Sequence, residues 1–291
     1  MLVKTYGSAV YGVDALTITI EVSVGGGARY YVVGLPDNAV KESMFRVESA
    51  LRVSGYRMPR QKIVVNLAPA DIRKEGSAYD LPIAIGILAA SGQIVVNDLE
   101  KYFLMGELSL DGGLQSIKGA LPIAIQARKE NFKGFVLPHV NAREAAIVND
   151  LSVYGMETLT HVIDFLNGKE IPTPVVVDTR EEFFRQVNSY EQDFADVKGQ
   201  ENIKRALEIA AAGGHNVILI GPPGAGKTML AKRLPTILPP LNLQEALEST
   251  KIYSVAGKLP VANALMTERP YRSPHHTISD VALVGGGICE I

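Results

Sequence analysis

Eight consecutive residues in the second half of the chain have the types and the spacing needed to hold a phosphate group. They fit the pattern G-x-x-x-x-G-K-[ST] at every fixed position, and they are Gly221, Pro222, Pro223, Gly224, Ala225, Gly226, Lys227 and Thr228. Glycines let the backbone curl so that several N–H groups converge on the β- and γ-phosphates of a nucleotide. The Lys227 ammonium would contact the same phosphate oxygens, and the Thr228 hydroxyl would ligate Mg²⁺. The segment therefore predicts a binding site for ATP and Mg²⁺.

The residues around this loop predict the elements that such a loop requires. The apolar run at 216–220 predicts a buried strand that leads into it, and Leu230 and Leu234 predict the inner face of the helix that follows. An earlier helix is expected over 200–212. Its apolar stripe consists of Ile203, Ala206, Leu207 and Ala210. A chance match in a glycine-rich turn is the alternative, and the agreement of the motif with its flanking elements argues against it.

Hydrolysis of ATP needs parts that the sequence does not display. In such folds an acidic residue at the end of a later strand holds Mg²⁺, and another group orients the attacking water. Residues 229–291 contain no apolar run that ends in Asp or Asp-Glu, because the run at 280–287 begins with its acid and the final Ile-Cys-Glu-Ile is too short. No residue is therefore assigned a catalytic role, and the expectation for this chain is ATP binding.

The first 172 residues predict a mixed α/β domain of their own. Strict alternation at 16–24 indicates a half-buried strand. Its inward side chains are expected to be Leu16, Ile18, Ile20, Val22 and Val24. Further strands are predicted at 30–35, 62–69, 102–110 and 134–138. Helices are predicted from Pro36-Asp37 to Ser54-Gly55, at 80–90 and at about 118–130.

A change of composition separates this domain from the second. Residues 173–194 carry prolines and many charges with little periodicity, which is typical of a linker. The pattern of regular elements restarts at residue 195. We therefore expect three parts, with 1–172 as an α/β domain, 173–194 as a linker and 195–291 as a partial nucleotide-binding α/β domain.

Bulk composition limits the partners and the compartment. The formal net charge is −2, and residues 190–291 hold ten Lys and Arg against ten Asp and Glu, so charge neither indicates nor excludes nucleic acid. Cys289 is the single cysteine, which favours a reducing compartment. The start shows no signal-peptide pattern, and the longest apolar run, 81–90, is too short to span a bilayer. A soluble cytoplasmic protein with no membrane partner is expected.

Long segments of the second half resemble one family of ATPases. The likeness is to the ATPase module of the magnesium-chelatase-like AAA+ proteins of the ComM/YifB family. The segments that carry it are 193–228, 234–257 and 269–287. Within them, 196–200 (Asp-Val-Lys-Gly-Gln) resembles the segment that lines the adenine pocket, which implies Val197 and Gly199 as contacts of the base.

The resemblance implies a function for an intact protein of this kind. Such relatives are ATP-driven ring helicases that promote branch migration on DNA in transformation or recombination, which implies DNA as a partner and a homo-oligomeric, hexameric ring. The family continues into an acidic Mg²⁺-binding strand, whereas this chain ends 63 residues after Thr228, so a C-terminally truncated member is expected. Two other functions stay open, namely a motor subunit of a magnesium chelatase and a nucleotide-binding assembly protein without turnover.

The first half resembles the proteolytic domain of Lon-type proteases. The segments that carry the likeness are 34–51, 74–88 and 106–127. Lon enzymes cut with a serine whose proton is removed by a lysine. The serine position falls on Ala78, with Ser77 one residue early, and the lysine position falls in Leu121-Pro122-Ile123, with Lys118 three residues away. Both members of the dyad are displaced, so a Lon-like domain that is not a protease is expected.

A small basic cluster near the C-terminus has two interpretations. It consists of Arg269, Arg272, His275 and His276. Adjacent histidines without a carboxylate or a cysteine make a poor metal site, because neighbouring side chains diverge. A solvated loop is one interpretation. In the family this stretch leads towards inserts that face the central pore, which implies a role in sensing substrate or nucleotide.

Overall fold

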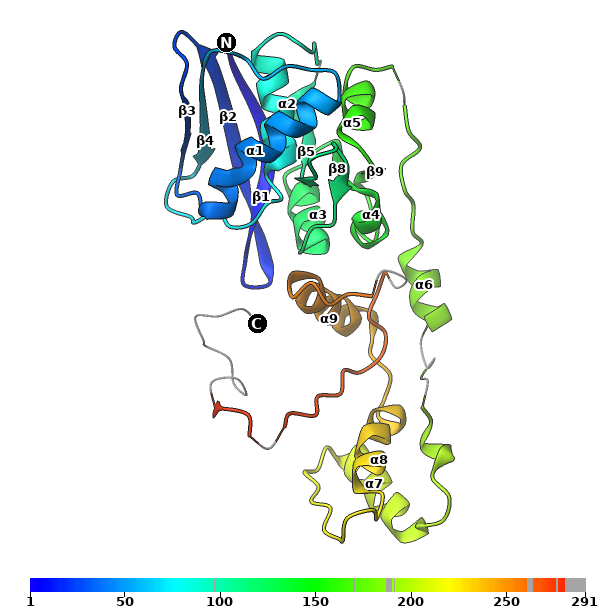
Figure 1. Ribbon diagram of the computed structural model, residues 1–291. Coiled ribbons are helices and arrows are strands. Elements are labelled where there is room, and N and C mark those ends of the chain that lie inside the picture. The colour runs from blue at the N-terminus through cyan, green and yellow to red at the C-terminus, as the bar shows by residue number, and fades with distance from the viewer. Residues whose placement is uncertain are drawn as a thin grey trace. The chain divides into compact units, whose positions relative to one another are not determined.

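The chain divides into two units (Figure 1). The first comprises Met1–Asp178 together with Thr250–Ala264, and the second comprises Thr179–Ser249 together with Leu265–Ile291. The computed structural model describes residues 1–96, 98–169, 171–186, 190, 192–260, 264–275 and 277–280. None of the helices in these ranges combines the length and the hydropathy that crossing a bilayer requires.

A seven-stranded sheet forms the centre of the first unit. Its strands, in spatial order, are β3 (Tyr30–Val33), β4 (Lys62–Ala68), β2 (Asp14–Gly25), β1 (Leu2–Tyr11), β5 (Tyr102–Leu104), β8 (Gly134–Pro138) and β9 (Ser152–Met156). β2 pairs with β1 and with β4 in antiparallel fashion, and the other neighbours are parallel. The predicted α/β class is therefore confirmed, with a mostly parallel sheet.

The burial of β2 follows the predicted alternation. Ile18, Ile20 and Val22 are fully buried, and Val24 is 5% exposed. Leu16 is 39% exposed, so the prediction that it points into the core is wrong. Leu16 lies near the tip of the β1–β2 hairpin, where its side chain extends past the core.

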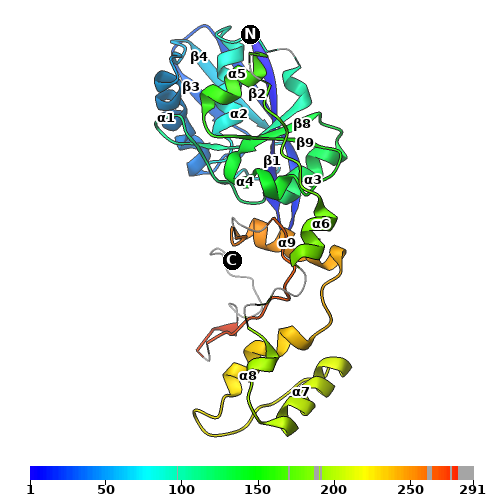
Figure 2. The same cartoon turned by 90° about the vertical axis from the view of Figure 1, so that its right-hand side faces the viewer.

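Helices cover both faces of this sheet (Figure 2). They are α1 (Asn38–Val53), α2 (Asp80–Ala90), α3 (Ala120–Lys129), α4 (His139–Ala145) and α5 (Leu159–Leu166). Gly86 of α2 packs against Val22, whereas Gln126 of α3 donates a 3.3 Å hydrogen bond to Thr17. Because Val22 and Thr17 are an odd number of positions apart on β2, their side chains leave opposite faces. α2 and α3 therefore cover opposite faces, and every residue of α2 is buried.

The strand predicted at 102–110 is interrupted. β5 ends at Leu104, and β6 (Glu107–Leu108) forms a separate small sheet with β7 (Leu114–Gln115). Between them, the Gly106 N–H donates to the Ala78 carbonyl at 2.8 Å, and the Gly106 carbonyl accepts from the Leu81 N–H at 3.0 Å. The backbone of Gly106 therefore bonds to the start of α2 instead of continuing the ladder with β8.

Asp37 fixes the start of α1 and also holds the loop before α2. Its Oδ1 accepts from the Val40 N–H at 2.8 Å, and its Oδ2 accepts from the Gly76 N–H at 3.0 Å. We expect Asp37→Ala to lower the free energy of unfolding by about 1–2 kcal/mol, since both N–H groups lose their acceptor. Chemical denaturation of the two proteins measures the difference, and equal midpoints with equal slopes would contradict it.

The second unit contains helices and no strand within the residues that the structure describes. Its elements are α6 (Thr179–Gln186), η2 (Phe194–Asp196), α7 (Glu201–Gly213), α8 (Lys227–Arg233), η3 (Leu234–Ile237) and the first part of α9 (Leu243–Val255). α6 lies inside the segment predicted as a linker. The remainder of α9, from Thr250 on, belongs to the first unit.

The buried strand predicted at 216–220 does not form. Ile218 and Ile220 are 82% and 90% exposed, and the segment has no regular structure. A strand exists only where a neighbour receives its backbone hydrogen bonds. Every strand of the described ranges lies between residues 2 and 156, in the first unit. The apolar pattern at 216–220 therefore has no sheet to join in the described part of this unit.

Candidate nucleotide-binding site

A small apolar cluster holds together the elements on either side of the phosphate loop. Its buried members are Phe194, Val197, Leu207 and Leu230, with Leu219, Leu234 and Ile237 packed against them. The cluster keeps α7 and α8 side by side (Figure 1). The inward position predicted for Leu230 is confirmed by an exposed fraction of 2%. On α7 the predicted stripe is only partly buried, since Ile203 is 40% exposed.

The phosphate loop is curled and not extended. Gly224 and Gly226 have φ of 82° and 81°, a backbone region that favours glycine. The Lys227 ammonium donates to the carbonyls of Gly221 and Pro222, at 2.8 and 2.7 Å. Gly226 then caps α8, and Thr228 is exposed in its first turn. The structure therefore places the ammonium and the hydroxyl of the motif at the junction between the curl and the helix.

The segment predicted to contact the base lies beside the loop. A Cβ added to Gly226 would stand 3.8 Å from Nε2 of Gln200. Gly199 is exposed with φ of 68°, whereas Val197 is 1% exposed because it lies in the apolar cluster. The structure thus brings 196–200 and the loop together. The roles of Val197 and Gly199 as base contacts stay predictions.

Arg233 ties the helix after the loop to the same segment. Its Nε donates to the Asp193 carbonyl at 3.0 Å, and its guanidinium contacts Oδ2 of Asp196 at 3.3 Å. A hydrogen bond from the Asp193 N–H, together with Arg233, lowers the pKa of Asp196. Sequence reasoning missed Arg233, because the spacing of 37 residues between it and Asp196 carries no local signal.

The basic cluster near the C-terminus does not form a metal site in the described residues. Arg269 donates to the Pro239 carbonyl at 2.6 Å, and Nδ1 of His275 lies 2.7 Å from the Thr277 hydroxyl. No three His, Cys, Asp or Glu side chains in the described ranges gather closely enough to hold a metal ion. His276, Cys289 and the run at 281–287 lie outside the described residues.

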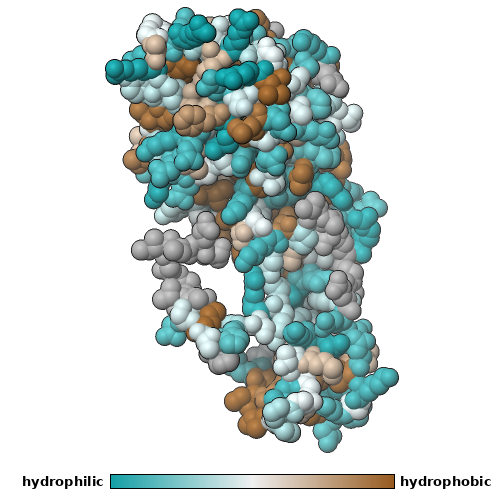
Figure 3. All heavy atoms as spheres, in the orientation of Figure 1, coloured by the Kyte–Doolittle hydropathy of each residue, from teal (hydrophilic) through white to brown (hydrophobic). Residues whose placement is uncertain are grey.

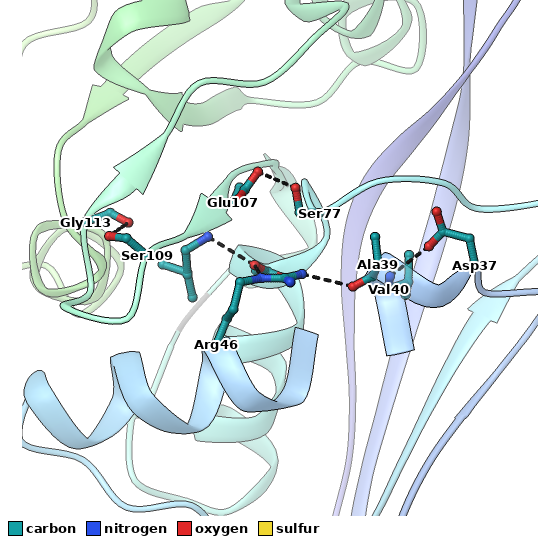
Figure 4. A network of polar contacts seen from close by, with 10 residues as sticks. Asp37, Ala39, Val40, Arg46, Ser77, Glu107, Ser109 and Gly113 are labelled. Atoms are coloured by element: carbon teal, nitrogen blue, oxygen red, sulfur yellow. Dashed lines mark hydrogen bonds and ion pairs between the residues drawn. The ribbon is translucent and has the colours of Figure 1, made fainter. Parts of the chain in front are cut away.

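The Lon-like segments place a serine beside a carboxylate and not beside an amine. The Ser77 hydroxyl donates to the Glu107 carboxylate, and the two side chains point towards each other (Figure 4). Lys74, three residues earlier, is fully buried and donates to the Pro69 carbonyl. Burial lowers the pKa of Lys74. Neither contact provides the serine–lysine pair on which Lon-type cleavage depends.

The position aligned with the Lon lysine is a buried apolar one. Leu121 is fully buried, and its N–H donates to Oε1 of Glu144 at 2.9 Å. The Ser254 hydroxyl, at the end of α9, donates to the same oxygen. Burial raises the pKa of Glu144. Lys118 is exposed and its side chain lies against Gly257, whereas the Ser77 hydroxyl bonds to Glu107.

Two family models and several relatives match this chain. The model described as subunit ChlI of Mg-chelatase matches residues 19–141, and the model described as magnesium chelatase, subunit ChlI, matches residues 193–291. YifB of Salmonella typhimurium is 46% identical over 281 residues, and the competence protein ComM of Haemophilus influenzae is 43% identical over 291 residues. The chain belongs to the ComM/YifB family of magnesium-chelatase-like proteins.

This ComM/YifB-family chain spans about half the length of the curated relatives it matches. The alignment covers 96% of the chain and 54% of YifB, and 98% of the chain and 56% of ComM. An archaeal Lon protease of Thermococcus kodakarensis is 35% identical over 94 residues, which are 32% of this chain and 12% of the protease. The predicted likeness to the ComM/YifB family and to Lon is therefore confirmed.

The ComM/YifB chain also holds an ion pair between a half-buried arginine and a buried aspartate, which sequence reasoning missed. Arg46 of α1 donates to both carboxylate oxygens of Asp80, at 2.6 and 3.0 Å, and to the Ala39 carbonyl at 3.0 Å (Figure 4). Asp80 is fully buried at the first residue of α2 and also accepts from the Leu108 N–H at 3.1 Å. Burial raises the pKa of Asp80 to about 6, although Arg46 acts to lower it. The sequence did contain one sign of this pair, because an aspartate directly before a run of apolar residues is expected to be buried and to need a partner.

Proposed function

We propose that this chain binds ATP with Mg²⁺ at residues 221–228. The observation that carries the proposal is the curled loop with Lys227 folded onto its carbonyls, in a sequence that fits the phosphate-binding motif at every fixed position. Phosphate oxygens would replace these carbonyls as partners of the ammonium, because a charged acceptor forms the stronger hydrogen bond.

The residues of the loop fit a metal–nucleotide ligand by their chemistry. The exposed Thr228 hydroxyl is an oxygen ligand of the kind that Mg²⁺ takes, and Mg²⁺ would supply charge neutralisation between the phosphates. The glycine backbone offers N–H groups, and the neighbouring segment 196–200 would contact the base. For the residues present in this chain, the proposal is therefore binding of ATP with Mg²⁺.

For the longer proteins of this family we propose an ATP-driven motor on DNA, built as a homo-oligomeric ring. Support comes from the 43% identity to a competence protein over 98% of this chain. The relation to magnesium-chelatase subunits favours a second candidate, a motor that assists metal insertion into a porphyrin. The two candidates are separated by measuring ATP turnover of a full-length relative with forked DNA and with porphyrin. Stimulation by DNA favours the DNA motor, and stimulation by porphyrin favours the chelatase motor.

The proposal for this chain is tested by thermal unfolding with and without nucleotide. At ATP concentrations about 100-fold above Kd, binding stabilises the folded state by about 2.7 kcal/mol, so we expect the melting temperature to rise by several degrees with Mg²⁺ and ATP. An unchanged melting temperature would overturn ATP binding.

A further inference from the structure

Four cations at one end of the first unit form a surface that the nucleotide site does not use. We call Arg29, Arg57, Arg60 and Lys62 the basic rim. Three of them lie within residues 54–62, which contain no acidic side chain, in a chain whose formal net charge is −2. The sequence therefore concentrates positive charge at this place, against the balance of the whole protein.

The fold brings the two loops that carry the basic rim together. The Ile63 N–H donates to the Arg29 carbonyl at 2.9 Å, and the Lys62 side chain lies against Gly27. The loops before β3 and before β4 thus meet at the end of the sheet near the N-terminus (Figure 1). Hydrophilic side chains cover much of that end in Figure 3.

The cations of the basic rim have no carboxylate partner within the described residues. Several other basic side chains of the unit do have one, for example Arg52 with Glu48 and Lys169 with Asp164. All four rim residues are exposed. Cations at the ends of helices often serve only to offset the helix dipole. That explanation does not apply to Arg29 and Lys62, which flank strands.

An exposed aromatic ring and a run of glycines adjoin the basic rim. Tyr31 on the edge strand β3 is 41% exposed, and Nζ of Lys62 lies 5.4 Å from the centre of its ring. Its neighbours Tyr30 and Val32 pack against the core, so the Tyr31 side chain leaves the opposite face of the strand. Gly25 and Gly26 have open space where a side chain would stand. The backbone at these two glycines is therefore not covered by a side chain beside the cations.

We propose that the basic rim and Tyr31 bind a single-stranded nucleic acid. Cations spaced along a groove or edge contact the phosphodiester backbone, and an exposed aromatic ring stacks on a base, which is the combination that proteins use for single strands. An anionic membrane could also use the charge, so vesicles of phosphatidylserine are included in the test as the contrary outcome. This inference rests on the proposed DNA partner, and it is independent of the ATP site because no rim residue lies in 196–228.

The test measures binding of a fluorescent twenty-residue oligothymidylate to the full chain by anisotropy at several salt concentrations. We expect Arg57→Glu/Arg60→Glu to weaken binding at least about 10-fold and to lower the slope of log affinity against log salt by about 1.4, which is about 0.7 for each lost phosphate contact. Tyr31→Leu is expected to weaken binding about 5-fold or more through lost stacking.

The test includes a matched charge-reversal variant and, as a second ligand, vesicles of phosphatidylserine. Lys129→Glu/Lys133→Glu changes the net charge equally on exposed residues away from the rim and is expected to bind nearly as the wild type does. Lys227→Ala is expected to bind the oligonucleotide normally, which separates this surface from the ATP site. Circular dichroism checks that each variant is folded. Equal weakening by both charge reversals, no binding by the wild type, or binding only to phosphatidylserine vesicles would overturn the proposal.

Discussion

The Lys227→Ala variant is expected to bind ATP at least about 100-fold more weakly than the wild type does. Each hydrogen bond from a charged donor contributes about 1.5–3 kcal/mol, and 2.7 kcal/mol corresponds to about 100-fold in Kd. The Lys227 ammonium already lies on the curl of the loop, 2.8 and 2.7 Å from two of its carbonyls. Little rearrangement is therefore needed before it meets a phosphate, and its loss removes a positioned charge.

Titration with a fluorescent ATP analogue, with Mg²⁺ present, measures this change. Lys232→Ala is the matched control, because Lys232 is exposed on the same short helix and has no part in the motif. We expect the control to bind within about twofold of the wild type, since a surface charge this far from the ligand is screened by salt. Equal affinities of Lys227→Ala and the wild type would show that the loop does not hold the phosphates.

Local patterns predicted most of the first unit correctly, because its elements bury their apolar faces against one another. The alternation of β2 and the helix at 80–90 were readable for this reason. The segment 216–220 shows where such reasoning stops. Its apolar residues have the pattern of a strand, but a strand depends on partners distant in sequence, and the described part of the second unit has none.

The polar contacts of the candidate sites were likewise predictable only where their residues are adjacent in the sequence. The motif at 221–228 is contiguous, so its chemistry was visible in the sequence. Arg233 with Asp196, and Glu144 with Ser254, join residues 37 and 110 positions apart. Nothing in residue type or spacing identifies such partners before the backbone brings them together. Contacts of this kind are decided by tertiary packing.

The Arg46→Met variant is expected to lower the free energy of unfolding by about 3–5 kcal/mol at pH 8, because it leaves the fully buried Asp80 carboxylate without its partner. Arg52→Met is the matched control on the same helix. Arg52 pairs with Glu48 at the surface, where such pairs contribute about 0–1 kcal/mol. Urea denaturation compares the two, and a similar loss in both variants would contradict a special role for Arg46.

The cost of losing Arg46 should depend on pH in a definite direction. The pKa of Asp80 is raised to about 6 in the folded protein, above the unfolded value of about 3.9. Between these pH values the folded state therefore binds the Asp80 proton more tightly than the unfolded state does. The free energy of unfolding accordingly falls as pH rises from about 3.9 to about 6. Arg46 lowers this pKa. Without it the folded pKa rises further, and the loss of stability extends above pH 6.

We therefore expect Arg46→Met to lose less stability at pH 5, where Asp80 is protonated in the folded variant, than at pH 8. Replacing Asp80 as well removes the buried charge. The double variant Arg46→Met/Asp80→Asn should accordingly be more stable than Arg46→Met at pH 8, and its loss relative to the wild type should vary less between pH 5 and pH 8. A destabilisation by Arg46→Met that is the same at both pH values would mean that packing of the arginine stem, and not its charge, stabilises this unit.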